Sequence, residues 1–370
     1  MKNVLILILF NSSVITSFSQ VVNTGVTDNF DSIEVGKISI GGMIDTYYGY
    51  DFNEPKSFLR PYCVSSARHN EVNINLAMID LKYKNNHVRA HLVPGFGTYV
   101  NDNYAAEKGS LKNLIEANVG VKLSKKKDIW IDAGIISSPY TNESALSKDH
   151  LVYTRSFSAE NVPYYLSGVK LSVPLNKKWS TYFYILNGWQ QIQDNNNPLS
   201  IGTQVEYRPN DSILFNWNTY VGNEYSVSAP SYRTRYFTDL YMIYKPKGKF
   251  SMTSCAYIGI QDTKDTLGKK ESLIWWQVNV IADYQLKKGS ISSRLEYFTD
   301  PKAAMLAAIT TVKGFETFSG SIGYNLKISN NAIFRLENRL FYSDKKVFID
   351  KRETLTNLSN LLIINLTVWF

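Results

Sequence analysis

The 370-residue chain has few of the side chains that support redox, metal or nucleophilic chemistry. It contains two cysteines, Cys63 and Cys255, and four histidines. Two cysteines make no disulfide framework, and CxxC spacing does not occur. No histidine lies beside a serine in an arrangement that suggests activation, and no glycine-rich phosphate loop is present. The sequence therefore predicts no cofactor, no metal and no enzymatic activity.

Long apolar runs are also missing. No stretch offers about 18 consecutive apolar residues, which excludes membrane-spanning helices. The amino terminus combines Lys2, a short apolar run at 4–10 and the small residues Ser17 and Ser19, which is typical of a secretory signal peptide. We predict a signal peptide at 1–19, a short periplasmic segment at 20–35 and one domain at 36–370. If such an exported chain enters a membrane, it does so as a barrel.

The net charge of +8 raises the question of nucleic-acid binding. The lysines, however, cluster in short turns such as 125–127, 177–178 and 287–288, with no basic helix or aromatic platform beside them. Solvated turns explain this distribution, so we predict no nucleic-acid partner.

Aromatic residues are abundant, with 25 Tyr, 18 Phe and 7 Trp, while the mean hydropathy is −0.21. The last stretch, 359–370, alternates with period two and ends on an aromatic residue. Its apolar row is Leu362, Ile364, Leu366, Val368 and Phe370. A buried last strand of a soluble sandwich would show the same alternation. An outer-membrane barrel closes with such a strand, ending in an aromatic girdle.

The connections between the predicted strands decide between these alternatives. Tight turns, such as Asn85-Asn86 and 246–248, alternate strictly with long loops, such as 53–70 and 138–163. This asymmetry is typical of outer-membrane barrels. The predicted fold class is all-β: a transmembrane antiparallel up-and-down β-barrel of about 16 strands, with short periplasmic turns and long extracellular loops. The closing strand should pair with the first strand, near 41–50.

Several predicted strands carry charges on the face opposite their apolar row. In 331–342, Arg335, Glu337 and Arg339 oppose Phe334 and Leu336. Stacked soluble sheets have the same period, but a barrel this wide leaves an aqueous lumen in which both signs of charge are hydrated. The predicted lumen-facing residues are Asp45, Arg89, Asp132, Lys170, Glu206, Arg233, Arg235, Asp239, Arg294, Glu296, Arg335, Glu337 and Arg339.

The longest loop, 138–163, is the candidate pore constriction. Its residues of interest are Asn142, Glu143, Lys148, Asp149, Arg155 and Glu160. We hypothesise that this loop folds inward and faces the lumen arginines; the alternative is a surface loop over the mouth. For the charges on the strands, a ladder that stabilises the wall is a second interpretation.

Several motifs resemble those of the OmpL-like β-barrel porins of Gram-negative bacteria, a family common among Bacteroidetes. They include Gly41-Gly42-Met43-Ile44-Asp45, Ala133-Gly134-Ile135-Ile136-Ser137, Tyr153-Thr154-Arg155-Ser156, Asn187-Gly188-Trp189 and Arg294-Leu295-Glu296-Tyr297-Phe298. The resemblance implies a porin of the cell outer membrane that passes small hydrophilic solutes by passive diffusion. A non-conducting barrel that acts as an adhesin or a structural partner in the envelope is the alternative.

The expected partners are outer-membrane lipid, small hydrophilic solutes and the barrel assembly machinery, which would read Phe370. A homo-oligomer is left open, as monomer and trimer are not distinguished by the sequence.

Overall fold

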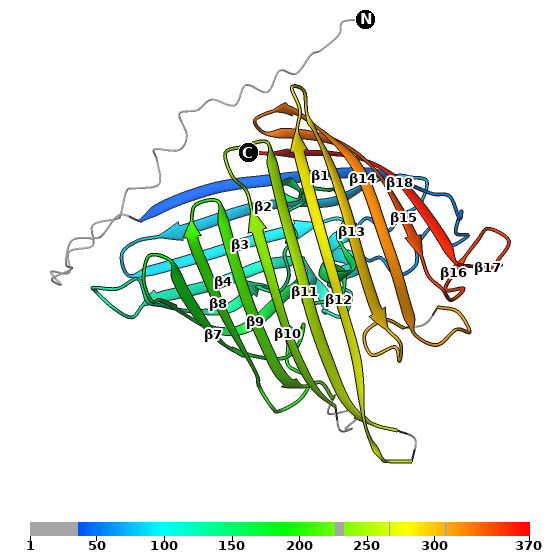
Figure 1. Ribbon diagram of the computed structural model, residues 1–370. Coiled ribbons are helices and arrows are strands. Elements are labelled where there is room, and N and C mark those ends of the chain that lie inside the picture. Colours follow the sequence, from blue (N-terminus) through cyan, green and yellow to red (C-terminus); the bar gives the residue numbers. More distant parts are fainter. Residues whose placement is uncertain (1–35, 226–232, 266, 308) are drawn as a thin grey trace, which may run out of the picture. The chain divides into compact units, whose positions relative to one another are not determined.

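Sixteen antiparallel strands close into a barrel in the computed structural model (Figure 1). The structure describes residues 36–225, 233–265, 267–307 and 309–370, so the predicted signal peptide and the segment 20–35 lie outside the described residues. The predicted fold class is confirmed. The wall consists of β1 (Lys37–Asp51), β2 (Val72–Lys84), β3 (Val88–Phe96), β4 (Leu114–Lys122), β5 (Trp130–Ser137), β6 (Tyr165–Pro174), β7 (Trp179–Leu186), β8 (Ser200–Asn210), β9 (Ile213–Asn223), β10 (Thr234–Tyr244), β11 (Phe250–Lys264), β12 (Lys270–Gln285), β13 (Ser290–Asp300), β14 (Phe315–Ser329), β15 (Ala332–Tyr342) and β18 (Leu358–Trp369).

The first and last strands close the cylinder, as predicted. β1 pairs with β18 in a register that runs from Met43 opposite Trp369 to Asp51 opposite Leu361. In Figure 1 the blue and red strands accordingly lie side by side. The backbone of Phe370 extends this ladder, because its N–H donates to the carbonyl of Gly42 and its carbonyl accepts from the Gly42 N–H, both at 3.1 Å.

Tight turns and longer loops alternate around the wall, as the sequence indicates. One end carries two- to seven-residue turns, such as 211–212 between β8 and β9, and the other carries loops such as 138–164. The connection between β11 and β12 is short, because these strands stay paired up to Lys264 opposite Lys270. β3 ends at Phe96, where Gly97 adopts a φ of 125° and starts a helical turn.

The two faces of the wall are inverted relative to a soluble protein. Outward positions of β18 are apolar and exposed, with Ile364, Leu366 and Val368 at 37–45% exposure. The inward positions between them include Asn365 and Thr367, which are buried. A surface of exposed aliphatic and aromatic side chains around a polar interior is the arrangement expected of a wall that faces lipid.

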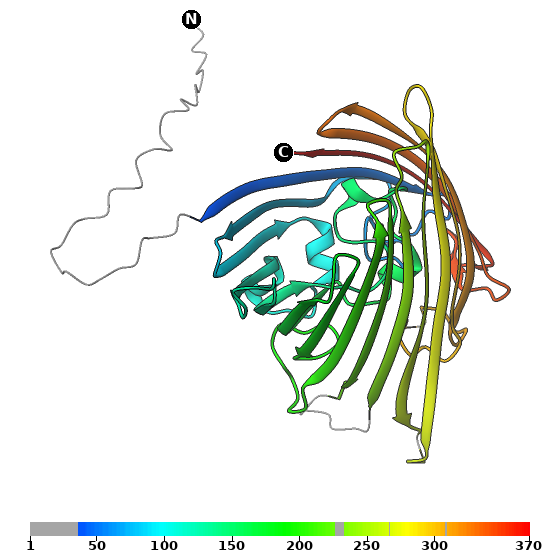
Figure 2. The same ribbon diagram turned by 60° about the vertical axis from the view of Figure 1, so that its left-hand side comes forward.

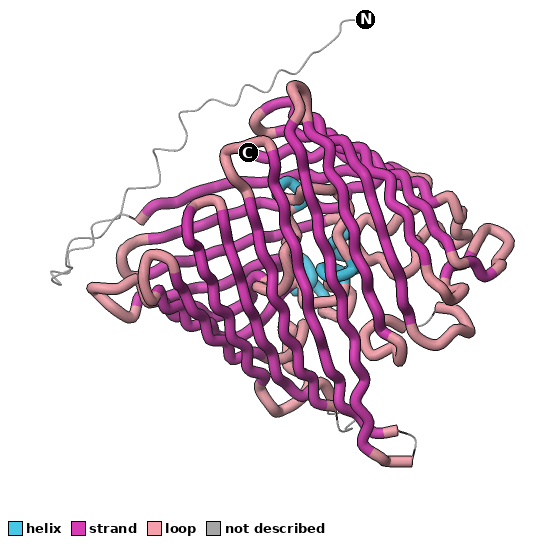
Figure 3. Tube along the Cα trace, in the orientation of Figure 1, coloured by secondary structure: helices cyan, strands magenta, loops and turns pink. Residues whose placement is uncertain are grey.

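Helical segments lie within the ring of strands, as both views show (Figures 2 and 3). They are α1 (Thr98–Asn103), α2 (Phe157–Glu160) and two 3₁₀ turns at Gly109–Asn113 and Ser147–Asp149. A small hairpin of β16 (Phe348–Ile349) and β17 (Leu355–Thr356) belongs to the loop before β18. In the described part of the chain, no helix is long and apolar enough to cross a membrane.

The interior has two layers. Toward the long loops, inward aromatic residues of the wall pack against aromatic residues of the loops, including Tyr62 stacked on Phe315 at 4.0 Å between ring centroids. On β13, β14 and β15, the inward positions closer to the tight turns are polar or charged. On β15, Phe341 belongs to the aromatic layer, while Arg335 and Glu337 lie closer to the tight turn.

The register at closure predicts a role for the last two residues. A Cβ atom added to Gly42 would lie 2.4 Å from Cζ of Phe370, so the terminal ring lies directly over this glycine. Removing Trp369 and Phe370 deletes this contact and the last ladder hydrogen bonds. We expect a lower fraction of folded barrel in the membranes of expressing cells, with export unchanged, measured by heat-modifiable migration on gels. The variant Phe370→Tyr keeps the ring and should fold normally; normal insertion of the truncation would contradict the prediction.

Candidate functional site

The loop 138–164 leaves β5 and crosses the interior of the barrel. At its start, the Thr141 N–H donates to Oδ2 of Asp239 on β10 at 2.6 Å. The amide of Asn142 then donates to Thr253 on β11 at 3.1 Å and to Asn279 on β12 at 3.0 Å. The loop is therefore held against the inward face of strands that lie far from β5 around the ring.

The middle of the loop reaches strands next to the closure. Arg335 on β15 donates to the carbonyl of Ser147 at 2.8 Å, and the hydroxyls of Ser147 and Thr367 lie 3.3 Å apart. Lys245, in the tight turn after β10, donates to the carbonyl of Asp149 at 3.0 Å. The loop thus descends through the polar layer to the end of the barrel that carries the tight turns.

His150, at this lowest part of the loop, is neutral at pH 7. Burial, together with the charges of Arg155 and Arg335, lowers its pKa to about 3. Its Nε2 lies 2.9 Å from the carbonyl oxygen of Ser144, which accepts the hydrogen bond from the ring. The imidazole therefore fixes the loop and adds no charge to the interior.

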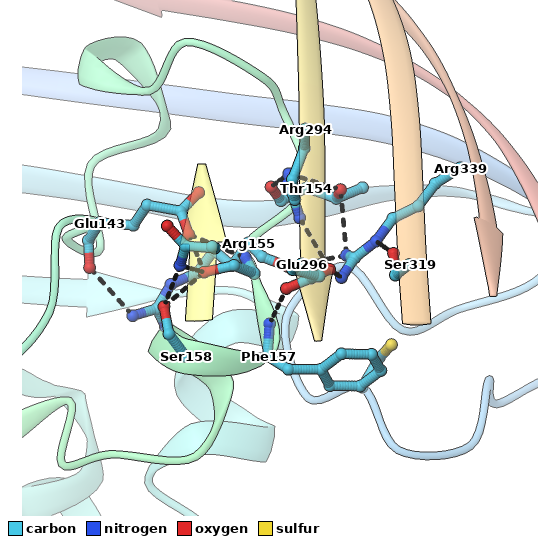
Figure 4. Close-up of polar contacts among 12 residues, drawn as sticks. Glu143, Thr154, Arg155, Phe157, Ser158, Arg294, Glu296, Ser319 and Arg339 are labelled. Carbon is cyan, nitrogen blue, oxygen red and sulfur yellow. Dashed lines mark hydrogen bonds and ion pairs between the residues drawn. The ribbon is translucent and has the colours of Figure 1, made fainter. Parts of the chain in front are cut away.

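The segment Thr154–Phe157 is the most densely bonded part of the loop (Figure 4). Glu337 accepts from the N–H and the hydroxyl of Thr154 at 2.7 and 2.8 Å. Glu296 accepts from the N–H of Phe157 at 2.8 Å. Arg294 donates to the carbonyl of Thr154, and Arg339 donates to the carbonyl of Arg155 at 2.8 Å.

The charged residues of this contact also pair with one another across β14. Arg339 on β15 forms an ion pair with Glu296 on β13, and Arg294 on β13 lies 3.5 Å from Glu337 on β15. The intervening strand offers only small residues there: Ser321 lies between Arg294 and Arg339, and Ser319 accepts from Nε of Arg339 at 2.9 Å. Serines at these inward positions leave room for the long side chains to meet.

The same residues therefore fit both interpretations of these charges: they pair with one another along the wall, and they contact the loop. Arg294, Glu296, Glu337 and Arg339 form the ladder and bind the loop with their remaining groups. Arg335 differs, because it donates to Asn365 at 3.2 Å and to loop carbonyls. Among the described residues, no carboxylate lies within 4 Å of its guanidinium nitrogens.

The expectation that these charges line water is wrong. Arg294, Arg335 and Glu337 are each 1% exposed, and Asp239 is 2% exposed. The loop covers these residues and supplies hydrogen-bond partners in place of water. Buried charges are stable only with such partners, which explains why the network includes so many loop atoms.

Within the loop, the predicted residues differ in how they are held. Glu143 accepts from the N–H of Ser156 at 2.9 Å, and the guanidinium of Arg155 lies 4.6 Å from the ring centre of Tyr164. Glu160 accepts from the N–H groups of Val64 and Ser65 at 2.8 and 3.0 Å, which ties it to the loop 52–71.

Lys148 and Asp149 pair with each other at 3.1 Å, and the side chain of Asp149 is half exposed. These two charges are therefore the least constrained of the predicted loop residues.

The remaining predicted lumen residues lie elsewhere in the ring. Arg89 pairs with Asp132 at 2.5 Å, and Lys170 lies 3.9 Å from the same carboxylate. Asp45 accepts from Asn75 at 2.8 Å and lies 3.4 Å from the hydroxyl of Tyr153.

Three predicted residues lie on β8 and near the start of β10. Glu206 pairs with Arg208 at 3.5 Å, and Arg235 stacks on Trp189 at 4.9 Å. Arg233 precedes β10 and is exposed.

Sequence reasoning missed several residues of the contact. Thr154, Ser147 and Phe157 act through backbone atoms or a hydroxyl in an irregular loop, which leaves no periodic signal. Asn279 was detectable, because the inward positions Gln277, Asn279 and Asp283 alternate with apolar residues along β12. Within the described ranges, no group of three or more His, Cys, Asp or Glu side chains is arranged to hold a metal.

In the described part of the chain, two cavities lie beside the loop. One, of about 210 Å³, lies between its first half and β10–β12, with Asp149, Tyr241 and Lys245 in its lining. The other, of about 230 Å³, lies between the loop and β2–β4, with Asp80, His91 and Arg155 in its lining. Both are lined by Ser138, Tyr140, Glu143 and Ser144, so this segment of the loop divides the interior.

A family model described as "Putative beta-barrel porin-2, OmpL-like" matches residues 37–370, which comprise the whole wall. The match confirms the resemblance seen in the sequence motifs. No curated protein matches the sequence.

Solved structures with the same fold include the outer membrane channel DcaP of Acinetobacter baumannii, with a TM-score of 0.62, 12% identity, and coverage of 92% of this chain and 99% of that one. An anion-selective porin from Comamonas acidovorans has a TM-score of 0.59, 10% identity, and coverage of 91% and 100%. OmpT of Vibrio cholerae, in its trimer form, has a TM-score of 0.59, 11% identity, and coverage of 91% and 100%. At these identities the likeness concerns the fold alone.

The buried network predicts a large effect of removing one carboxylate. Glu337→Gln leaves Arg294 buried with a weakened partner and loosens the bond to Thr154. Breaking one partner of a buried pair costs about 3–5 kcal/mol. We therefore expect a clearly lower midpoint of unfolding in detergent. The matched control is Glu271→Gln, which removes an exposed ion pair with Lys302 and should cost less than about 1 kcal/mol. Equal midpoints for the two variants would contradict the role of the network.

Proposed function

Since this chain belongs to the OmpL-like β-barrel porin family, we propose that it is an outer-membrane porin for passive diffusion of small hydrophilic solutes, with the loop 138–163 as its constriction. The observation that carries this proposal is the loop's course through the interior, where it is hydrogen-bonded to inward residues of β10, β13 and β15. A segment in this position sets both the width and the charge of any path through the barrel.

The remaining space limits what passes. The two cavities beside the loop have volumes of about 210 and 230 Å³, and each is lined by residues of both signs of charge. A path through them admits ions and small polar molecules. Larger solutes require the loop to move, and the hydrogen bonds of Thr154 and Phe157 oppose that movement.

Further properties belong to the same proposal. The segment 1–19 directs export, the tight turns lie in the periplasm, and Phe370 is read by the assembly machinery. The barrel acts without enzymatic chemistry. One structure of the same fold is described as an anion-selective porin and another as a trimer. We propose a homo-oligomer for this chain on that analogy.

A second candidate function is a non-conducting barrel that serves as a structural partner in the envelope. The burial of Arg294, Arg335 and Glu337 favours it, because an open bore would leave these charges in water. Reconstituted protein that gives no ion conductance and no liposome swelling with sugars or amino acids would support this candidate over the porin.

Shortening the loop tests the constriction. Deletion of Asn142–Asp149 removes the contacts to Thr253, Asn279 and Arg335 and opens the space between the two cavities. We expect single-channel conductance in a planar bilayer to rise at least twofold.

The control for this deletion shortens the exposed tip of the last loop at Lys351–Glu353, which lies outside the interior contacts. Its conductance should equal that of the unaltered chain. If the deletion of Asn142–Asp149 also leaves conductance unchanged, the loop is not the constriction.

A further inference from the structure

The cavity between the loop 138–163 and strands β2–β4 has an enclosed side and a wet side. Its lining includes Met78, Val93 and Ile115 on the wall, which make part of it apolar. Lys82 lines it toward the tight turns, and the Lys82 side chain is 53% exposed, so solvent reaches the cavity from that end. Its volume of about 230 Å³ is large enough to hold several water molecules or one small organic solute.

Arg155 is a buried, fixed cation on this cavity. Its side chain is 7% exposed and stacks on Tyr164, with its guanidinium 4.6 Å from the ring centre. Among the described residues, neither Nε nor Nη1 has a hydrogen-bond partner, and no carboxylate lies within 4 Å. Most buried polar side-chain atoms have a hydrogen-bond partner. An acceptor placed in the cavity would therefore stabilise these two N–H donors.

Glu143 lies on the same cavity and has an acceptor oxygen without a hydrogen-bond donor. It is 6% exposed, and its Oε2 accepts both hydrogen bonds from Ser156. Its Oε1 has no donor within reach among the described residues. The carbonyl of Glu143 lies 3.4 Å from Nη2 of Arg155, so the two side chains are neighbours in the loop. One small molecule can therefore contact both.

On the opposite wall of the cavity, the charged side chains already pair with one another. The ring nitrogens of His91 lie 2.9 Å from Asp80 and 2.9 Å from Glu116, and Lys82 lies 2.8 Å from Asp80. When both carboxylates are ionised, both nitrogens of His91 must donate, which makes the ring an imidazolium. The wall thus pairs its own charges, and the unmet donors and acceptor lie on the loop.

We propose that this cavity binds a small zwitterion, of the size and chemistry of a short α-amino acid, with the carboxylate at Arg155 and the ammonium at Glu143. A simple anion would pair with Arg155 but would be repelled by the carboxylate of Glu143. A simple cation would pair with Glu143 but would be repelled by Arg155. A molecule with both groups satisfies both, and charge-assisted hydrogen bonds supply the specificity. This inference rests on the proposed function only in that passage brings the solute to the cavity.

Binding of L-alanine to the full-length protein in detergent, measured by calorimetry, tests the proposal. Propionate carries the carboxylate alone and isopropylamine carries the cation alone. We expect saturable binding of alanine, roughly millimolar because a transported solute must also leave, and at least tenfold weaker binding of the two single-charge probes. No saturable alanine binding, or equal binding of propionate, would overturn the proposal.

Two substitutions locate the site. Arg155→Met keeps most of the packing on Tyr164 and should weaken alanine binding at least tenfold, while Glu143→Gln should weaken alanine more than propionate. Arg208→Met is the matched control, because Arg208 is 55% exposed and pairs with Glu206 outside the cavity. Its alanine affinity should be unchanged. If Arg155→Met does not fold, as seen by heat-modifiable migration, Glu143→Gln decides the question by the same comparison of probes.

Conductance in potassium chloride separates this inference from the proposed function. A protein that conducts but shows no alanine binding remains a porin, and only the binding site is overturned. A protein that binds alanine but does not conduct keeps the site and loses the assignment as a diffusion channel.

Discussion

Closure of the sheet between β1 and β18 is the constraint on which the rest of the structure depends. A wall in lipid has no water for its backbone groups, so each N–H and carbonyl must find a partner in the next strand, and a sheet achieves this only without edges. The terminal strand meets this requirement up to its last residue, because Phe370 exchanges both backbone hydrogen bonds with Gly42. Once the ring is closed, the alternation of side chains along each strand places one row in lipid and the other inside.

The charged side chains of the inward row need hydrogen-bond partners, and the loops supply them. Arginine and glutamate inside a wide barrel are stable in water or with partners, and here the loop 138–163 takes the place of water. The ion pairs across β14 neutralise the charges, while the N–H groups of Thr154 and Phe157 and the carbonyl of Arg155 complete their hydrogen bonds. Loop and wall therefore stabilise each other, since neither the buried charges nor the irregular backbone is satisfied alone.

The wall follows from local sequence patterns, whereas the loop contacts depend on backbone atoms of a distant segment. This difference explains which features the sequence predicts. The closing strand, the alternation of turn lengths and the inward orientation of residues such as Arg339 all follow from local patterns of period two, and these were predictable. The burial of Arg339 was not, because it depends on a segment 184 residues away that contributes a backbone carbonyl. Carbonyl and N–H groups are the same in every residue, so the sequence carries no sign of which loop residue will bind. Asn279 does carry a signal in the sequence, because its strand alternates polar and apolar residues.

A loop that is fixed mainly through its backbone leaves its side chains available for other purposes. Glu337 and Glu296 hold the main chain on both sides of Arg155, yet the Arg155 guanidinium points away from that network, onto Tyr164 and the cavity beside β2–β4. Its Nε and Nη1 donors have no hydrogen-bond partner among the described residues, and burying such donors costs free energy. The same rigid backbone that narrows the barrel also holds this cation at a defined position, which is what selection among small solutes requires. On the proposed function, restriction of the bore and recognition of a solute are two consequences of one set of hydrogen bonds.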